Sequence, residues 1–433
     1  MKKSFVLALS ALTATVVSLS AQESKWTEHV TPYGFFRTYA AFDTRDSKAG
    51  TEDLFYYVPY DQSNNAEGKD IYSNPSLKMY AITSRLGLNV GGFKYGSMSV
   101  SGKFETDFYL MNGSSAGLRL RQAYVNLLWD KLGYMENSIS LKIGQAWHPM
   151  AADLPCSISL ESGTPFGPFA RSPQIMMDAK VNNFLFTAGI LYPMQYRPTG
   201  PNGASEEYIK YSLIPEAYVG ISYVRPHFIA RVGTDFISLV PRHTVTAKTD
   251  KHDVGTRVKD RINMFNPFVY LQVNSGLLKI NAKSVYASGG DHLRMMGGYA
   301  LFDTTDELNY KYTPLRSTVN FASFSYGKAW QLMCTIGYMK ALGTADELRV
   351  NGEGFANASD IYYSSNGFKN INQMFRVTPT LAYNIGKFTV ALEYDNTQVE
   401  YGDISKLDNH GLATKDKHWV MNHRVLGMVK FTF

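Results

Sequence analysis

The chain has 433 residues, of which 45% are hydrophobic and 18% are charged, with a formal net charge of +6. After the N-terminus, no stretch is long and apolar enough for a spanning helix of about 20 residues, which excludes a helical membrane protein. Two cysteines are too few for a disulfide-stapled secreted fold of this length. The 29 tyrosines and 25 phenylalanines make the chain aromatic. This composition is typical of a membrane β-barrel, whose apolar residues occupy every second position.

The N-terminus has the pattern of a secretory signal peptide. Two lysines precede an apolar run from Phe5 to Leu19, and small residues follow up to Ala21. A short membrane anchor is the alternative, but the run is short for spanning a bilayer. We expect a cleaved signal peptide over residues 1–21, a short periplasmic segment over 22–32 and a transmembrane β-barrel over 33–433.

Segments with alternating polar and apolar residues recur from Tyr33 to the last residue. Between Tyr80 and Val90, for example, Ile82, Leu86 and Leu88 lie on one face, with small and polar residues on the other. The pattern predicts sixteen strands, near 33–43, 79–90, 97–111, 119–130, 138–148, 174–182, 184–192, 215–223, 228–239, 263–274, 278–287, 316–326, 330–342, 374–384, 388–397 and 419–433.

The predicted connections alternate strictly between short turns and long loops. The long loops cover roughly 44–78, 112–118, 149–173, 193–214, 240–262, 288–315, 343–373 and 398–418. This asymmetry is typical of outer-membrane barrels, in which the long loops face outside the cell. A water-soluble sandwich has no reason to segregate its loops by length. We therefore expect an all-β fold, a closed antiparallel barrel in the outer membrane of a Gram-negative bacterium.

Tryptophans fall at the ends of the predicted strands. Trp129 and Trp330 lie next to short turns, whereas Trp147 and Trp419 lie next to long loops. This placement predicts one aromatic girdle at each membrane interface. Cys334 lies mid-strand on the predicted lipid face, so we expect the two cysteines to be unpaired.

Charged residues at alternate strand positions are assigned to the barrel interior, since a charge facing lipid near the midplane costs about 2–4 kcal/mol. A barrel of about 16 strands leaves an aqueous lumen, and we expect pore-lining or constriction residues among these charges. The predicted set is Arg37, Arg85, Lys103, Glu105, Asp107, Lys142, Arg171, Lys180, Arg231, Arg376, Glu393 and Arg424. Inward positions also fall on Asp178, Glu216, Asp235, Lys279, Lys283, Asp395 and Lys430. The excess of bases favours anions, unless opposite charges pair across the wall and cancel.

One predicted strand departs from this pattern. Arg119 and Arg121 share the parity of the apolar residues that follow them. Either both arginines lie above the membrane at the loop end, or a β-bulge switches faces. We favour the first interpretation.

Short motifs occur along the chain, including Gly144 to Pro149 (GQAWHP) before the third long loop, Arg171 to Gln174 (RSPQ) after it, and Arg376 to Pro379 (RVTP) further on. In these motifs the chain resembles the DcaP-like or Bacteroidetes-type outer-membrane porins. The resemblance implies a 16-stranded barrel, often trimeric, with an inward-folded third loop and Arg171 at its border. We expect this chain to depart from the family in lacking an N-terminal coiled coil, because only the segment from Gln22 to Thr31 lies between the predicted signal peptide and the first predicted strand. A C-terminal strand ending in Phe433 resembles the signal read by the barrel-assembly machinery.

The sequence shows no enzyme constellation. His148, Asp153 and Ser157 lie at chance spacing in a loop, which argues against a triad. We expect no enzyme activity, no cofactor, no metal site and no nucleic-acid partner, but contacts with outer-membrane lipid and lipopolysaccharide. The expected function is a porin for passive diffusion of small polar, preferentially anionic, solutes. The alternative is a surface adhesin or structural barrel whose extracellular loops bind a partner.

Overall fold

The structure is a computed structural model that describes residues 28–50, 55–111, 115–130, 132 and 137–433. The predicted signal peptide over 1–21 lies outside the described residues, as does most of the segment 22–32. In the described part of the chain, no helix is long and apolar enough to cross a membrane.

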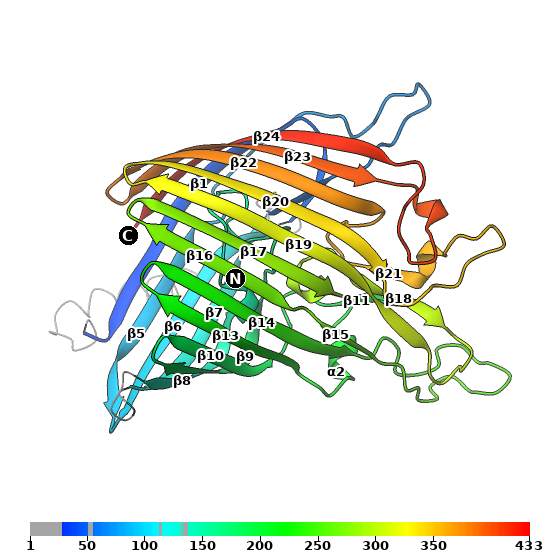
Figure 1. Cartoon of the computed structure of the whole chain (residues 1–433), viewed down its shortest axis with the longest axis horizontal. Helices are drawn as coiled ribbons and strands as arrows, with labels where there is room; N and C mark the ends of the chain where they lie inside the picture. Colours follow the sequence, from blue (N-terminus) through cyan, green and yellow to red (C-terminus); the bar gives the residue numbers. More distant parts are fainter. Residues whose placement is uncertain (1–27, 51–54, 112–114, 131, 133–136) are drawn as a thin grey trace, which may run out of the picture.

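Sixteen antiparallel strands form the wall of a closed barrel (Figure 1). They are β1 (Val30–Asp43), β4 (Ser76–Tyr80) continued by β5 (Arg85–Tyr95), β6 (Met98–Met111), β7 (Ser115–Trp129), β8 (Ser138–Trp147), β9 (Arg171–Val181), β10 (Phe184–Leu191), β13 (Glu216–Arg225), β14 (Phe228–Leu239), β15 (Ile262–Phe265) continued by β16 (Phe268–Ser275), β17 (Leu278–Ser288), β19 (Lys311–Gly327), β20 (Trp330–Thr344), β22 (Ile371–Ile385), β23 (Phe388–Tyr401) and β24 (His418–Thr432). Each predicted segment contains a wall strand, so the predicted strands and fold class are confirmed.

The barrel closes through the first and last strands. β1 pairs with β24 in antiparallel register, with Phe36 opposite Phe431 and Arg37 opposite Lys430. On its other side β1 pairs with β4 and β5. Because the barrel is closed, the wall has no open strand edge. The backbone N–H and C=O groups of its strands therefore bond to one another, since a bilayer offers them no hydrogen-bond partners.

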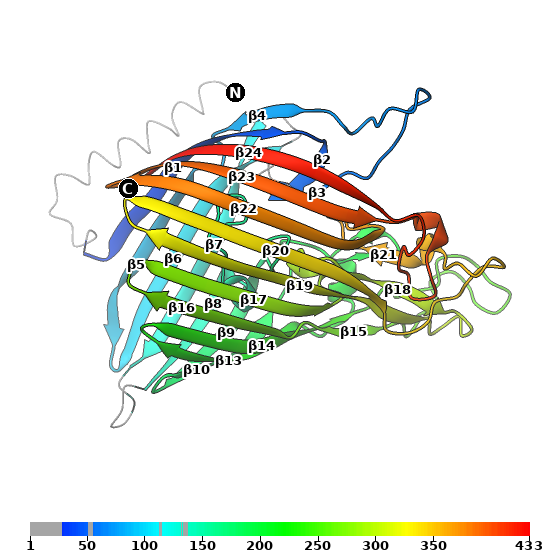
Figure 2. The ribbon, with the colours of Figure 1, turned by 45° about the horizontal axis from the view of Figure 1, so that its top comes forward.

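The connections differ in length at the two ends of the barrel. Short turns gather at one end and the long loops at the other (Figures 1 and 2). The loops contain β2 (Ser47–Gly50), β3 (Phe55–Pro59), β11 (Thr199–Gly200), β12 (Gly203–Ala204), α2 (Glu207–Lys210), β18 (Gly298–Asp303), β21 (Ile361–Tyr363) and the 3-10 turns η1 (Pro149–Ala151), η2 (Asp291–Leu293), η3 (Ala358–Asp360) and η4 (Ile404–Lys406).

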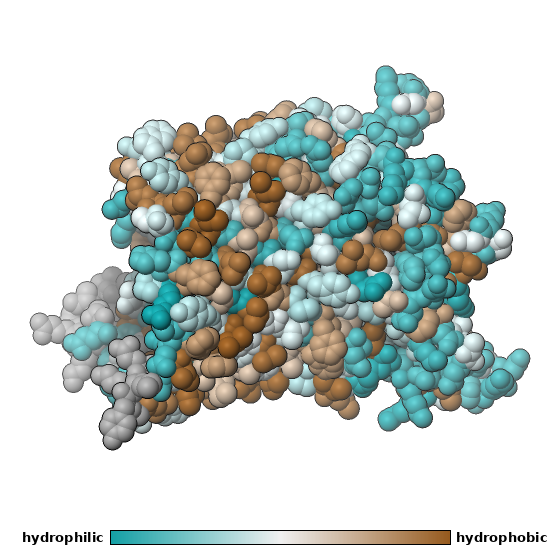
Figure 3. Space-filling view, viewed as in Figure 1, coloured by the Kyte–Doolittle hydropathy of each residue, from teal (hydrophilic) through white to brown (hydrophobic). Residues whose placement is uncertain are grey.

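The two faces of the wall differ in polarity. On β24, Val425, Val429 and Phe431 are exposed on the outside, whereas Arg424 is buried inside. Apolar residues gather over the strands, and hydrophilic residues gather over the long loops (Figure 3). This alternation is the pattern of a wall with lipid outside and polar groups inside.

Two of the sixteen predicted segments are interrupted. Between β15 and β16, Pro267 has no N–H to donate to the ladder. Between β4 and β5, residues 81–84 leave the ladder beside Arg37. There the Arg37 backbone N–H donates to the Ser84 hydroxyl (3.1 Å), and its Nε donates to Thr83 Oγ1 (2.9 Å).

The predicted aromatic girdles need one correction. Trp330 and Trp419 are exposed on the outer face, 62% and 51% respectively. Trp147 instead lies inside the barrel, where its ring packs on Phe169 at 5.2 Å. Trp147 is the last residue of β8, and the chain enters the loop that contains η1 directly after it. Both cysteines are free, as predicted.

Candidate functional site

A β-bulge on β7 brings Arg119 and Arg121 into the barrel interior. Glu105 lies opposite Gln122 and Thr106 lies opposite Leu120, so Arg121 is the extra residue in β7. Because of this extra residue, the inward-facing side chains of β7 are odd-numbered up to Arg121 and even-numbered from Gln122 onward. Our interpretation that both arginines lie above the membrane is therefore wrong, and the bulge is correct.

These arginines form an ion-pair cluster with two carboxylates of β6. Arg119 binds Asp107 through two hydrogen bonds of 2.8 and 2.9 Å. Arg121 bridges Glu105 (2.8 Å) and Asp107 (2.5 Å). Glu105 also accepts the Tyr33 hydroxyl at 2.9 Å. Because paired buried charges hold one another in place, the cluster presents a rigid, charged patch to the lumen.

Residues 148–170, termed the inner loop, follow the inner wall for half of its circumference. Asp153 pairs with Arg231 of β14 at 2.7 Å. The Leu154 carbonyl accepts from Asn281 of β17 at 2.8 Å.

Beyond that point, the inner loop contacts the strands that follow. Cys156 N–H donates to Ser323 of β19 at 3.0 Å. The Ile158 and Ser159 N–H groups donate to Glu393 of β23 at 2.6 and 2.7 Å. Glu161 then pairs with Arg37 of β1 at 2.7 Å. The contacts therefore run in strand order from β14 to β1 and hold the inner loop inside the barrel.

Cavity A lies between the inner loop and the wall strands β1, β5, β6, β7, β8 and β24. Its volume is about 300 Å³. Five basic and two acidic side chains line it, namely Arg37, Arg85, Arg119, Arg121, Lys430, Asp107 and Glu161. Trp147 and Phe169 are among its apolar lining residues. The excess of basic groups gives this cavity a positive potential.

Cavity B, of about 330 Å³, lies further around the wall between the inner loop and strands β7 to β14. Lys142 and Arg231 line it, together with Asp178 and His148. Trp147 borders both cavities.

Three of the predicted pore-lining residues face inward but are covered by loops. Arg376 is fully buried and donates to the carbonyls of Tyr56 (3.1 Å) and Tyr57 (3.0 Å) in β3. Arg424 binds Asp43, and Glu393 holds the inner loop. Arg376 and Glu393 fix loops to the wall, whereas Arg424 pairs with Asp43 of the neighbouring wall strand β1. None of the three lines either cavity.

The remaining predicted residues are divided between the cavities and the barrel ends. Arg37, Arg85 and Asp107 line cavity A, with Glu105 bound to Arg121 beside it, whereas Lys142 and Arg231 line cavity B. Lys103 lies over the Tyr33 ring at 4.8 Å, and Lys180 lies next to the short turn after β9. Arg171 stacks on Trp147 at 5.1 Å and donates to Gln195.

Sequence reasoning missed several lining residues. Arg119 and Arg121 were misplaced because their parity in the sequence fits either a position above the membrane or a β-bulge, and only the pairing with β6 distinguishes the two. Trp147 was assigned to a girdle, and Glu161 was not singled out. The rejected triad does not form, since Asp153 pairs with Arg231 while His148 binds Glu216 at 2.6 Å.

Comparisons with known proteins give matches at the level of structure. No family model matches the chain, and no curated protein matches it. The outer-membrane channel DcaP of Acinetobacter baumannii is similar, with a TM-score of 0.64, 15% identity and coverage of 93% of this chain and 97% of DcaP. The chain has the fold of the outer-membrane porins.

Two further solved structures share this fold. The anion-selective porin from Comamonas acidovorans has a TM-score of 0.51 and 13% identity over 93% of this chain and 99% of the porin. In vitro folded OmpT, an outer-membrane protein of Vibrio cholerae, has a TM-score of 0.51 and 13% identity over 93% of this chain and 97% of OmpT.

Proposed function

We propose that the chain is a porin of a Gram-negative outer membrane that passes small polar solutes and prefers anions. The observation that carries the proposal is cavity A, in which five basic side chains face two acidic ones beside the inner loop. Rings of Lys and Arg in a pore select against cations. The inner loop narrows the lumen, so a passing solute meets this basic surface at close range.

The basic side chains of cavity A are held by contacts that leave a net positive charge. The Arg119 and Arg121 guanidinium groups share Asp107 and Glu105. Arg85 has only a loose contact with Glu105, at 3.8 Å. Charges therefore do not cancel in pairs across the wall at this site.

Planar-bilayer recordings of the purified full-length protein test the proposal. We expect open, ohmic conductance steps and, in a salt gradient, a reversal potential of the sign given by anion preference. Cation preference would contradict the selectivity. A silent barrel would overturn the channel itself and support the adhesin alternative.

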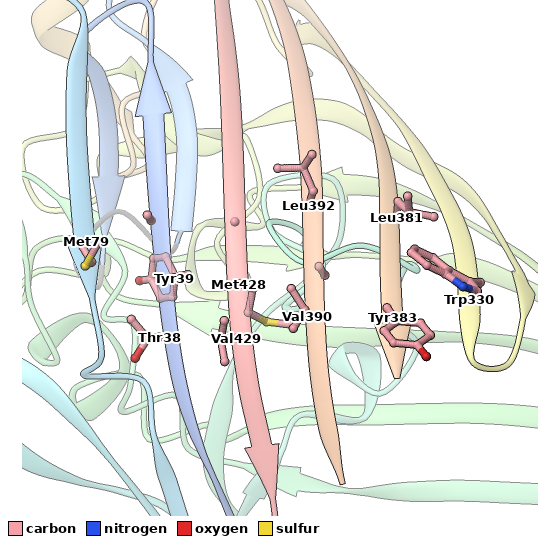
Figure 4. Close-up of a pocket in the computed structure, with 13 residues that line it drawn as sticks. Thr38, Tyr39, Met79, Trp330, Leu381, Tyr383, Val390, Leu392, Met428 and Val429 are labelled. Atoms are coloured by element: carbon pink, nitrogen blue, oxygen red, sulfur yellow. The ribbon is translucent and has the colours of Figure 1, made fainter. Parts of the chain in front are cut away.

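We also infer membership of the DcaP-like family and a homotrimeric assembly. The resemblance of the sequence marks and the shared fold support the family. A groove on the outer wall of β1, β20, β22, β23 and β24 supports assembly, with a volume of about 700 Å³ (Figure 4). Gly427 and Ala40 line it between larger apolar side chains such as Leu392 and Trp330. A second copy of the chain is the proposed occupant.

A further inference from the structure

Four buried side chains meet where the inner loop begins. Glu216 at the start of β13, Asp235 on β14 and His292 in η2 place one ligand atom each within 4.8 Å of one another. His148, the first residue of the inner loop, binds Glu216 Oε1 through Nε2 at 2.6 Å. His292 Nε2 lies 3.0 Å from Asp235 Oδ2 and 3.5 Å from Glu216 Oε1.

Two carboxylate oxygens in this cluster have no hydrogen-bond partner. Glu216 Oε2 and Asp235 Oδ1 are buried and unpartnered among the described residues. The other oxygen of Asp235 accepts from Asn266 Nδ2 at 3.0 Å, which fixes the carboxylate. A buried carboxylate oxygen without a partner costs about 1–3 kcal/mol or more, so both oxygens are favourable acceptors for a bound ligand.

The charge of the cluster is also unbalanced. In the described part of the chain, neither Glu216 nor Asp235 forms an ion pair with a lysine or arginine. The Met150 backbone N–H donates to His148 Nδ1 (3.2 Å). Since that nitrogen accepts, it carries no proton, and a neutral His148 must donate from Nε2 to Glu216. Even a protonated His292 would then leave two buried carboxylates facing one cation.

We propose that Glu216, Asp235 and His292 bind one divalent transition-metal ion, with Zn²⁺ as the best fit. Two carboxylates and a neutral imidazole make the site neutral when a divalent ion is bound. Imidazole suits Zn²⁺, whereas Ca²⁺ and Mg²⁺ prefer oxygen ligands alone. His148 is a positioning residue that orients Glu216 through its hydrogen bond to Oε1.

The bound ion would fix both ends of the inner loop. His148 lies at its start, and near its end the Phe169 N–H donates to the Leu293 carbonyl in η2 at 2.8 Å. Through His292 the ion ties η2 to β13 and β14. The metal site therefore anchors the loop that borders both cavities, whatever solute the barrel passes.

Elemental analysis of the purified full-length protein tests the site. The protein is prepared from cells grown with zinc and is separately refolded with Zn²⁺ alone. We expect about one equivalent of zinc per chain, ligation by nitrogen and oxygen at about 2.0–2.2 Å in X-ray absorption, and no displacement by Mg²⁺. Less than about a tenth of an equivalent in both preparations would overturn the proposal.

Variants separate this site from other zinc sites. Asp235→Asn keeps the side-chain shape and should lower zinc occupancy at least about tenfold. His292→Gln serves as a second variant if the first does not fold. Asp61→Asn is the matched control, because Asp61 pairs with His418 at 2.6 Å in a partly exposed pair with a single carboxylate, and it should keep its zinc. Unchanged occupancy in Asp235→Asn would place the ion elsewhere and refute the assignment.

Discussion

Arginine side chains inside the barrel differ in how their charge is balanced. Arg424 is 1% exposed, and its guanidinium donates to both oxygens of Asp43 at 2.9 and 2.8 Å. Arg85 lines cavity A, and its contact with Glu105 is long, at 3.8 Å. The first arginine therefore contributes to the stability of the wall, while the second contributes its charge to the lumen.

Arg85→Gln should weaken anion preference without unfolding the barrel. Removing one unbalanced charge beside the path changes the energy of a passing ion by a fraction of a kcal/mol after screening, or about twofold in the permeability ratio. Reversal potentials in a salt gradient measure this ratio. Lys69→Gln is the control, because Lys69 is 78% exposed in a loop and pairs with the exposed Glu67. An equal shift in both variants would contradict the role of cavity A.

Asp43→Asn should destabilise the barrel by about 3–5 kcal/mol, because it leaves the buried Arg424 guanidinium without its carboxylate. Urea unfolding in lipid vesicles, followed by tryptophan fluorescence, measures the free energy. Asp416→Asn removes a carboxylate that is 66% exposed and bound to Lys406, so about 0–1 kcal/mol is expected. A loss as small as the control's would show that the Arg424 pair is not structural.

At the scale of elements, the inner loop is held mainly by wall side chains that bind its backbone. Glu393 accepts two adjacent N–H groups, and Asn281 donates to the Leu154 carbonyl. A loop without regular structure has no ladder to satisfy these groups, so the wall must do so. Changes in the wall can therefore release the loop.

Glu393→Ala should release the middle of the inner loop, because the Ile158 and Ser159 N–H groups lose their acceptor. We expect larger or noisier single-channel conductance steps in planar bilayers. Glu400→Gln on the same strand is the control, since Glu400 pairs at 3.7 Å with Lys417 near the strand's loop end. Steps identical to wild type would show that Glu393 does not restrain the loop.

The pair of Arg37 and Glu161 predicts the pH range over which the inner loop stays tethered. Burial alone would raise the pKa of Glu161, but the Arg37 guanidinium outweighs it and lowers this pKa. A lowered pKa means that the contact is fully present above the ordinary glutamate pKa of about 4.3 and is lost only as pH falls further, through the lowered pKa of Glu161. Conductance should therefore stay constant from neutral pH to about 5 and change only in more acidic solution. Glu161→Gln should abolish the acid response.

At the scale of the whole molecule, closure of the barrel determines which outer surface another chain could contact. The pairing of β1 with β24 joins the first and last strands of the wall, and the groove of Figure 4 lies across this seam. Several outward residues here are small, including Ala40 and Gly427. An apolar groove in the wall is filled either by lipid or by a neighbouring chain.

Gly427→Leu should reduce the trimer without harming the single barrel. A Cβ at Gly427 meets no atom within 4 Å, so the larger side chain fits in one chain but fills the groove between chains. The mass of the detergent-solubilised protein, measured by analytical ultracentrifugation, should fall toward that of a monomer. Val232→Leu, on the outer face of β14 and 48% exposed, is the control. A monomeric wild type would contradict the assembly and leave the groove to lipid.

The sequence alone determined the strands, the segregation of long and short connections, and the inward face of most charges. It could do so because side chains along a barrel strand face lipid and lumen in strict alternation. A charged side chain that faces lipid costs free energy at its own position, whatever its neighbours are. The inward orientation of Arg37, Arg231 or Arg424 can therefore be predicted without knowing which residues surround it.

Only the tertiary structure decided which inward-facing charged side chains line the cavities and which are buried. The bulge at Arg121 depends on pairing with β6, and the burial of Arg376 depends on β3, which lies more than 300 residues away in the chain. The meeting of Glu216, Asp235 and His292 likewise depends on how two strands and a loop pack. Such contacts leave no local period in the sequence, because they are set by closure of the whole barrel.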